Sequence, residues 1–248
     1  LGILMLAMLL TAGSGISSAP AADTVPGIVG RDDRQAQPYD GGWPWVAIGR
    51  VNRATGGFCS GTLIAADRVL TAAHCLWNRR RGVMLPADRV HFVPGWWRGQ
   101  YRAHATAARI VTDPALAFDA TGRPKAAATD WAVLVLDGKT MRGQWPKPVP
   151  LAEAGLAQPG MTLSRAGYGR DRPHALSRQD GCHALGLANA GRLLLHDCDA
   201  TFGDSGSPVL VGKAGSYAIL GVHIATVEHD GGQAGAAVLV TPAMASAS

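Results

Sequence analysis

Residues 203–208 of the chain are Gly-Asp-Ser-Gly-Ser-Pro, and they lead directly into the apolar run Val209-Leu210-Val211. Small residues followed by apolar ones indicate a tight turn that enters a buried strand. The small neighbours leave the Ser205 hydroxyl accessible and let the backbone N–H groups of Gly203 and Ser205 converge on one point. This segment therefore predicts a nucleophile beside an oxyanion hole, although a plain glycine-rich turn would explain the segment taken alone.

Short runs of β-forming residues extend in both directions from this turn, and no long stretch beyond the N-terminus repeats convincingly every 3.6 residues. The 248 residues include 32 Gly and 15 Pro spread along the chain, which argues against a helical bundle and a collagen-like repeat. We therefore expect an all-β protein. The predicted strands are 45–51, 58–64, 68–71, 132–136, 161–166, 208–211, 217–224 and 236–240.

Residues 145–151, Trp-Pro-Lys-Pro-Val-Pro-Leu, divide the predicted strands into two halves. Their three prolines cannot donate ladder hydrogen bonds, which favours an extended crossover. We expect an N-terminal β-barrel over residues 28–144 and a C-terminal β-barrel over residues 152–248.

The N-terminal residues differ in composition from the rest of the chain. Leu1 to Ala12 is almost wholly apolar, and small residues follow it, with Ala19-Pro20-Ala21 matching an A-x-A cleavage site. This pattern predicts a signal peptide over residues 1–22 and a short propeptide over residues 23–27. A membrane anchor is the weaker alternative, because the apolar run is well short of ~20 residues. We expect a secreted or periplasmic protein with no membrane contact after signal cleavage.

The formal charge is +5, but the basic residues are scattered except for Arg79-Arg80-Arg81. Scattered charge does not favour nucleic acid as a partner. The arginine run could bind a membrane or a polyanion, but no basic amphipathic helix accompanies it, so a solvated loop is the favoured interpretation.

The four cysteines form two clusters, Cys59 with Cys75 and Cys182 with Cys198. Four cysteines allow three pairings, and the clustering favours two local disulfides formed in an oxidising compartment. A metal site is the alternative, because His74 adjoins Cys75. It is disfavoured because the chain has no C-x-x-C or H-x-x-x-H spacing, and we expect no metal.

Two further segments carry candidate catalytic groups. His74 follows the small residues Thr71-Ala72-Ala73, which allow a tight turn to present the imidazole at the end of a strand. Asp130 precedes the apolar run 131–136, so its carboxylate lies at the mouth of a buried strand and needs a donor. An imidazole N–H is a suitable donor.

The order of these residues along the chain narrows the choice of mechanism. An α/β-hydrolase needs an acid and then a histidine after the nucleophile, but no Asp or Glu lies between Gly206 and Val222. The order His74, Asp130, Ser205 is instead one of the known triad orders.

TAAHC around His74, DWAVLVL from Asp130 and GDSGSP around Ser205 together resemble the trypsin-like, chymotrypsin-fold serine peptidases. SGSP in place of SGGP is similar to their bacterial, glutamyl-endopeptidase-like branch. The resemblance implies two antiparallel six-stranded β-barrels with the active site in the cleft between them. It implies a secreted, monomeric serine endopeptidase that needs no cofactor and cleaves protein or peptide substrates. His74 would be the general base, Asp130 its orienting partner and Ser205 the nucleophile.

The resemblance also implies an activation switch, in which the amine of a freed Ile28 would pair with Asp204. The chain departs from the family pattern here, because Arg31 follows Ile28-Val29-Gly30 and Pro26-Gly27 precedes it. Arg31 or Arg34 is an alternative partner for Asp204. The bridge from Cys198 to Cys182 would also differ from the usual pocket disulfide, and the family's C-terminal helix would be short or missing.

Three residues are candidates for the substrate pocket. Asp199 would favour Arg or Lys at the scissile position, whereas His223, with Thr226 as a hydroxyl partner, would favour an acidic side chain. In a third arrangement Asp199 pairs with His223 and leaves an uncharged pocket. All three preferences remain open, and a non-catalytic binding module on the same fold is the alternative to an enzyme.

Overall fold

The computed structural model describes residues 25–153 and 155–247, so the predicted signal peptide lies outside the described residues. Strands dominate the described part, and its one α-helix, α1 (Pro242–Ser246), is five residues long. The expected all-β class is confirmed. No helix among these residues has the length and apolar character that crossing a membrane requires.

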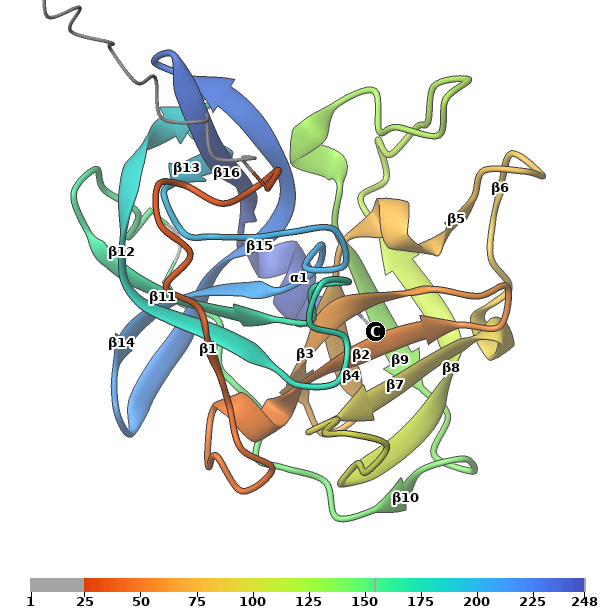
Figure 1. Ribbon diagram of the computed structural model, residues 1–248. Helices are drawn as coiled ribbons and strands as arrows, with labels where there is room; N and C mark the ends of the chain where they lie inside the picture. The colour runs from red at the N-terminus through yellow and green to blue at the C-terminus, as the bar shows by residue number, and fades with distance from the viewer. Residues whose placement is uncertain (1–24, 154, 248) are drawn as a thin grey trace, which may run out of the picture.

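The first half of the chain forms a closed ring of six strands (Figure 1). The strand order is β8-β7-β2-β3-β4-β9, and pairing of β8 with β9 closes the ring, while β10 adds to its edge. The strands are β2 (Ile48–Arg53), β3 (Phe58–Ala65), β4 (Arg68–Thr71), β7 (Val90–Pro94), β8 (Ala103–Thr112), β9 (Ala132–Leu136) and β10 (Arg142–Gly143).

The second half forms another ring of six strands beside the first (Figure 1). Its order is β12-β11-β14-β15-β16-β13, closed by pairing of β12 with β13. The strands are β11 (Thr162–Gly167), β12 (Ser177–Ala188), β13 (Leu193–His196), β14 (Pro208–Lys213), β15 (Ser216–His229) and β16 (Gly232–Leu239). The expected pair of six-stranded barrels is confirmed. Closure stabilises each ring, because a ring without open edges provides hydrogen-bond partners for the backbone of every strand.

Both ends of the described chain cross to the opposite ring. β1 (Gln35–Ala36) pairs with β12 of the second ring, although the expected boundary placed residues 28–144 with the first. Backbone N–H and C=O groups at the edge of β12 need hydrogen-bond partners, and β1 provides these partners. At the other end, α1 buries Met244 completely, and Ala247 accepts a hydrogen bond from Arg68 of β4. The C-terminal helix was expected to be short or missing, and the structure shows a short one.

Short elements connect the strands and carry parts of the site. The 3₁₀ helices are η1 (Trp45–Ala47), η2 (Ala73–Leu76), η3 (Ala87–Arg89) and η4 (Ala127–Thr129), and β5 (Trp77–Asn78) pairs with β6 (Val83–Met84). Arg79-Arg80-Arg81 form the exposed turn between β5 and β6, as expected for a solvated loop. Residues 145–151 run between the rings, where Val149 donates to Leu63 and Pro150 accepts from Ile219.

Candidate active site

His74 and Asp130 meet at the ends of two strands of the first ring. His74 lies in η2 directly after β4, and Asp130 lies between η4 and β9, the partner of β4. Asp130 Oδ2 is 2.6 Å from His74 Nδ1, and Asp130 Oδ1 accepts the backbone N–H of His74 at 2.8 Å. The carboxylate is only 4% exposed, so these two donors offset much of its desolvation. They also fix the orientation of the imidazole.

Ser205 lies on the turn before β14 of the second ring and reaches the first ring through its backbone. Its carbonyl accepts the N–H of Ser60 in β3 at 2.9 Å. Cys75 Sγ lies 3.8 Å from both His74 Nε2 and the Ser205 carbonyl oxygen. Within residues 25–153 and 155–247, the Ser205 hydroxyl makes no hydrogen bond to His74 Nε2. Catalytic hydrogen bonds are often long without substrate and tighten when it binds.

The turn that carries Ser205 requires a glycine at position 203. Gly203 has a φ of +102°, and its carbonyl accepts the Ser60 hydroxyl at 3.2 Å. A Cβ on Gly203 would lie 2.6 Å from the Tyr168 carbonyl oxygen, so no side chain fits. Among the described residues, no group accepts the N–H of Gly203 or of Ser205. Both amides are thus free of protein acceptors in this part of the chain, and the assignment of an oxyanion hole to them stays a prediction.

The disulfides are Cys59–Cys75 and Cys182–Cys198, so the predicted pairing is confirmed. The first joins β3 to η2 and holds His74 beside the nucleophile turn. The clusters that resemble metal sites, Cys59 with His74 and Cys75, and Cys182 with Asp197 and Cys198, both consist mainly of these bridged sulfurs. A bridged sulfur is not a thiolate ligand, so neither cluster fits a metal ion.

Asp204 is completely buried, and its partner is Arg165 of β11. Arg165 Nη1 lies 2.9 Å from Asp204 Oδ1 and donates a hydrogen bond to Ser207 Oγ at 2.9 Å. Asp204 Oδ2 accepts the N–H of Thr201 at 2.8 Å. The carboxylate beside the nucleophile is therefore neutralised from within the second ring.

The expected contact between Ile28 and Asp204 is absent from the described residues. The N–H of Ile28 donates to the Val25 carbonyl at 3.0 Å, within a local turn. Of the alternative partners, Arg34 comes to 4.0 Å from Asp204, and its main ion pairs are with Asp32 and Asp171. Arg165 is the cation that lies nearest to the Asp204 carboxylate among the described residues, in a chain that still carries residues 25–27 before Ile28.

The segment before β1 lies against the residues expected to form the substrate pocket. Gly27 is buried, its carbonyl accepts the N–H of Ala200 at 2.8 Å and its N–H donates to Gln233 Oε1 at 2.8 Å. Asp199 Oδ1 accepts the N–H of Val29 at 2.8 Å. Burial raises the pKa of Asp199, and the hydrogen bond from Val29 opposes this shift. Residues 25–29 thus contact Asp199, which the sequence analysis expects in the substrate pocket, and its neighbour Ala200.

His223 does not pair with Asp199, so the third pocket arrangement is wrong. Its ring nitrogen Nδ1 is 3.2 Å from Nε2 of His196, a residue that the sequence analysis did not single out. Both histidines are buried, whereas Thr226 is exposed and makes no side-chain hydrogen bond to His223 in the described part of the chain. The Asp199 carboxylate instead accepts the N–H of Val29 through Oδ1.

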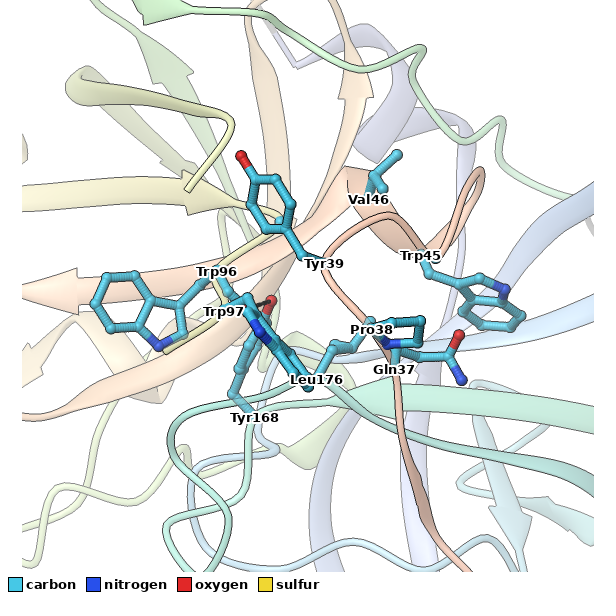
Figure 2. A pocket seen from close by; sticks show the side chains of 11 residues that line it. Gln37, Pro38, Tyr39, Trp45, Val46, Trp96, Trp97, Tyr168 and Leu176 are labelled. Atoms are coloured by element: carbon cyan, nitrogen blue, oxygen red, sulfur yellow. Dashed lines mark hydrogen bonds between the residues drawn. The ribbon is translucent and has the colours of Figure 1, made fainter. Parts of the chain in front are cut away.

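A hollow lined by aromatic side chains lies between segments of both halves (Figure 2). Tyr39, Trp96 and Trp97 meet Tyr168 there, and the Tyr168 hydroxyl donates to the Trp96 carbonyl at 3.1 Å. None of the described residues that line it has a charged side chain. It buries apolar surface between the two halves and offers no catalytic group.

Two residues of this region, Arg165 and His196, were not predicted from the sequence, although the sequence around each of them indicates a buried polar side chain. Arg165 is the one charged residue of the predicted strand 161–166, and a charged side chain that is buried in a strand needs an opposite charge nearby. His196 follows three leucines at the end of a short apolar run, a position typical of a buried imidazole.

Comparisons with known proteins agree with this geometry. The trypsin family model matches residues 32–245. Cathepsin G of Homo sapiens is 30% identical over 171 residues, which cover 68% of this chain and 57% of that protein, so the chain spans less than two thirds of that relative. A solved structure of a Glu endopeptidase in complex with MPD has a TM-score of 0.70 and 21% identity, and the match covers 88% of this chain and 95% of the other. At this identity the likeness concerns the fold alone.

Proposed function

The chain belongs to the trypsin family, and from this premise we propose that it is a serine endopeptidase that cleaves peptide bonds through an acyl-enzyme intermediate. His74, Asp130 and Ser205 form its triad. The observation that carries the proposal is the pair of short contacts between Asp130 and His74, 2.6 and 2.8 Å, beside a serine whose turn offers two unpaired amides.

In the first step Ser205 Oγ attacks the scissile carbonyl carbon while His74 Nε2 accepts the hydroxyl proton. Asp130 accepts the His74 Nδ1 proton in a hydrogen bond, which keeps Nε2 available as a base and stabilises the imidazolium that forms. The oxyanion lies against the N–H groups of Gly203 and Ser205.

The imidazolium then gives its proton to the leaving amine as the peptide C–N bond breaks, and an ester to Ser205 remains. Water attacks this ester, with His74 again taking the proton, and the carboxyl product leaves as the Ser205 hydroxyl is restored. Every proton passes through one imidazole whose ordinary pKa lies near neutrality.

The test is labelling by a fluorophosphonate, which reacts with an activated serine, combined with peptide hydrolysis. We expect Ser205→Ala to abolish labelling and to lower kcat by roughly a millionfold, and His74→Ala to cost about as much, because the triad acts as a unit. Ser216→Ala, at an exposed position, is the matched control and should leave both readouts unchanged. A folded wild-type protein that is not labelled would support the alternative of a non-catalytic binding module.

Two features support export as part of this proposal. Two disulfides persist in an oxidising compartment, and the N-terminal apolar run with its A-x-A site supports a signal peptide. We place the mature enzyme outside the cytoplasm, secreted or periplasmic.

We also propose that the N-terminal segment regulates the pocket and not the oxyanion turn. The contact of Asp204 with Arg165 supports an oxyanion turn that is ordered without a freed Ile28 amine. The contacts of Gly27 and Val29 with Ala200, Gln233 and Asp199 support blockage of the pocket until residues 25–29 leave it.

A further inference from the structure

Two histidines on neighbouring strands of the first ring lie in contact with each other. His91 belongs to β7 and His104 to β8. His91 Nδ1 is 3.1 Å from His104 Nε2, and the ring centroids are 5.3 Å apart with an angle of 27° between the ring planes. The catalytic steps proposed above use neither ring, so the pair needs an explanation of its own.

Pairing of β7 with β8 brings the two rings to one face of the sheet. His91 lies opposite Thr106, and His104 precedes Thr106 by two residues, so all three side chains project from the same face. The two histidines are 13 positions apart in the chain. The missing H-x-x-x-H spacing, which led the sequence analysis to expect no metal, therefore does not apply to a pair assembled from two strands.

The separation of the two facing nitrogens fits two ligands of one metal ion. Zn–N bonds of about 2.0–2.1 Å place two ligand nitrogens about 3.3 Å apart in tetrahedral geometry and about 2.9 Å apart at a right angle. The observed 3.1 Å lies between these values. Without an ion, one ring donates an N–H to the other. When an ion binds, this nitrogen loses its proton, the outer nitrogen of the same ring is protonated, and both facing nitrogens become ligands.

Both rings can be reached by an ion and are able to bind it. His91 and His104 are half-buried, so one side of the pair faces solvent. Burial, with His91 nearby, lowers the pKa of His104. A neutral imidazole is the form that binds a metal ion, so the ring needs no deprotonation at physiological pH.

The surroundings favour a transition metal over a hard cation. In the described part of the chain, no carboxylate forms a hydrogen bond or an ion pair with either ring. Arg142 of β10 lies opposite His104, and its Nη1 donates to two carbonyl groups of its own loop. Ca²⁺ and Mg²⁺ require several oxygen ligands. Imidazole nitrogens instead suit Zn²⁺, Ni²⁺ and Cu²⁺, of which Cu²⁺ binds most tightly.

A polar oxygen without a partner belongs to the same row of the sheet. Asn52 of β2 lies opposite His91, and its buried Oδ1 has no hydrogen-bond partner among the described residues. Ligating histidines usually donate their second ring N–H to an oxygen, and an ion with few protein ligands keeps bound water. Metal binding thus adds donors of the kind that Asn52 Oδ1 lacks.

An ion at this position would link two strands whose own ladder is short. The pairing of β7 with β8 consists of two residue pairs. Residues 95–102, which connect these strands, reach the second half of the chain, where the N–H of Arg98 donates to the His174 carbonyl at 2.7 Å. An ion that binds only the folded arrangement of His91 and His104 should therefore stabilise the protein.

We propose that His91 Nδ1 and His104 Nε2 bind one divalent transition-metal ion, of the class of zinc and copper, that links β7 to β8. The clusters of three potential ligands found among the described residues include neither histidine, so water completes the coordination. This site is separate from the proposed peptidase function and does not depend on it.

Thermal unfolding of the full chain, purified without a histidine tag, measures the binding of zinc chloride. We expect Zn²⁺ at about 100 times its dissociation constant to raise Tm by roughly 5–10 °C, and calcium chloride at the same concentration to leave Tm unchanged. His91→Gln and His104→Gln should each weaken zinc binding by about tenfold or more, because loss of a group behind a metal ligand already costs that much. His183→Gln, at an exposed position of β12, is the matched control and should respond like the wild-type protein.

Electron paramagnetic resonance of the protein loaded with Cu²⁺ identifies the ligands without a need for activity. We expect hyperfine coupling to two imidazole nitrogens in the wild-type protein and in His183→Gln, and to fewer in His91→Gln or His104→Gln. His74→Ala removes the histidine of the proposed triad and should change neither the spectrum nor the zinc-dependent Tm. A wild-type Tm that zinc does not raise, an equal response in His91→Gln, or a copper signal lost only in His74→Ala would overturn the proposal.

Discussion

Replacing Arg165 with Met should destabilise the protein and disorder the nucleophile turn. Arg165 and Asp204 are both 0% exposed, and their charged atoms are 2.9 Å apart. Met fills most of the space of the aliphatic stem but leaves the carboxylate without its cation. Asp204 would retain the N–H of Thr201 at 2.8 Å, the Thr201 hydroxyl at 3.3 Å and Arg34 at 4.0 Å.

The size of the loss follows from this burial. Removing one partner of a buried ion pair costs about 3–5 kcal/mol, because the remaining charge stays desolvated. The three surviving contacts place the expected loss near the lower end, about 3 kcal/mol, so a domain of ordinary stability still folds. Arg165→Met combined with Asp204→Asn removes both charges and should lose roughly 2 kcal/mol less than the sum of the single variants.

Urea unfolding and peptide hydrolysis measure the two consequences. We expect kcat to fall about 100-fold in Arg165→Met, as when one oxyanion donor is lost. Asp67→Asn, which breaks the partly exposed ion pair with Arg68, is the control and should cost less than about 1 kcal/mol with full activity. An Arg165→Met protein with wild-type stability and activity would refute the role given to the Arg165–Asp204 pair.

Three further outcomes are expected. Replacing Cys59 and Cys75 with Ala should lower the free energy of unfolding by about 3 kcal/mol in chemical denaturation, since their bridge closes a short loop with a sequence separation of 16 residues. The pKa of His196 is about 3 in the folded state, lower than the value of about 6.5 in the unfolded state. Between these two pH values the unfolded state binds more protons, so the free energy of unfolding should fall by about 1.4 kcal/mol for each pH unit of acidification. Urea unfolding at several pH values should show a smaller dependence on pH in His196→Gln. A chain starting at Gly30 should have a KM for peptides roughly tenfold lower than the longer chain, because residues 25–29 no longer compete at Asp199; equal KM values would contradict blockage of the pocket.

Local signals in the sequence were sufficient to predict the fold class and the disulfides. Short runs of β-forming residues bounded by turn residues predict strands, and two cysteines close together in the sequence predict a local disulfide. The pairing of β1 with β12 could not be predicted in this way, because Gln35 and its partner Arg178 are far apart in the chain. A two-residue exposed strand also has no hydrophobic pattern of its own.

The site also contains residues that the sequence could predict and residues that it could not. His74, Asp130 and Ser205 lie in segments whose small and apolar neighbours mark them, whereas Arg165 and His196 act through partners that only the folded barrel brings near. Asp199 illustrates the limit most clearly. Its position along the chain suggested a charge at the base of the pocket, but in the structure its carboxylate accepts a hydrogen bond from the backbone N–H of Val29.

The internal partner of Asp204 changes what the N-terminal segment can control. Asp204 and its ion-pair partner Arg165 both belong to the second half of the chain, so this ion pair does not involve the N-terminal segment. Residues 25–29 instead bind Asp199, Ala200 and Gln233, which lie on the pocket side. If order of the oxyanion turn and access to the pocket depend on different residues, as we propose, removal of the segment should alter KM while the chemistry of Ser205 stays the same.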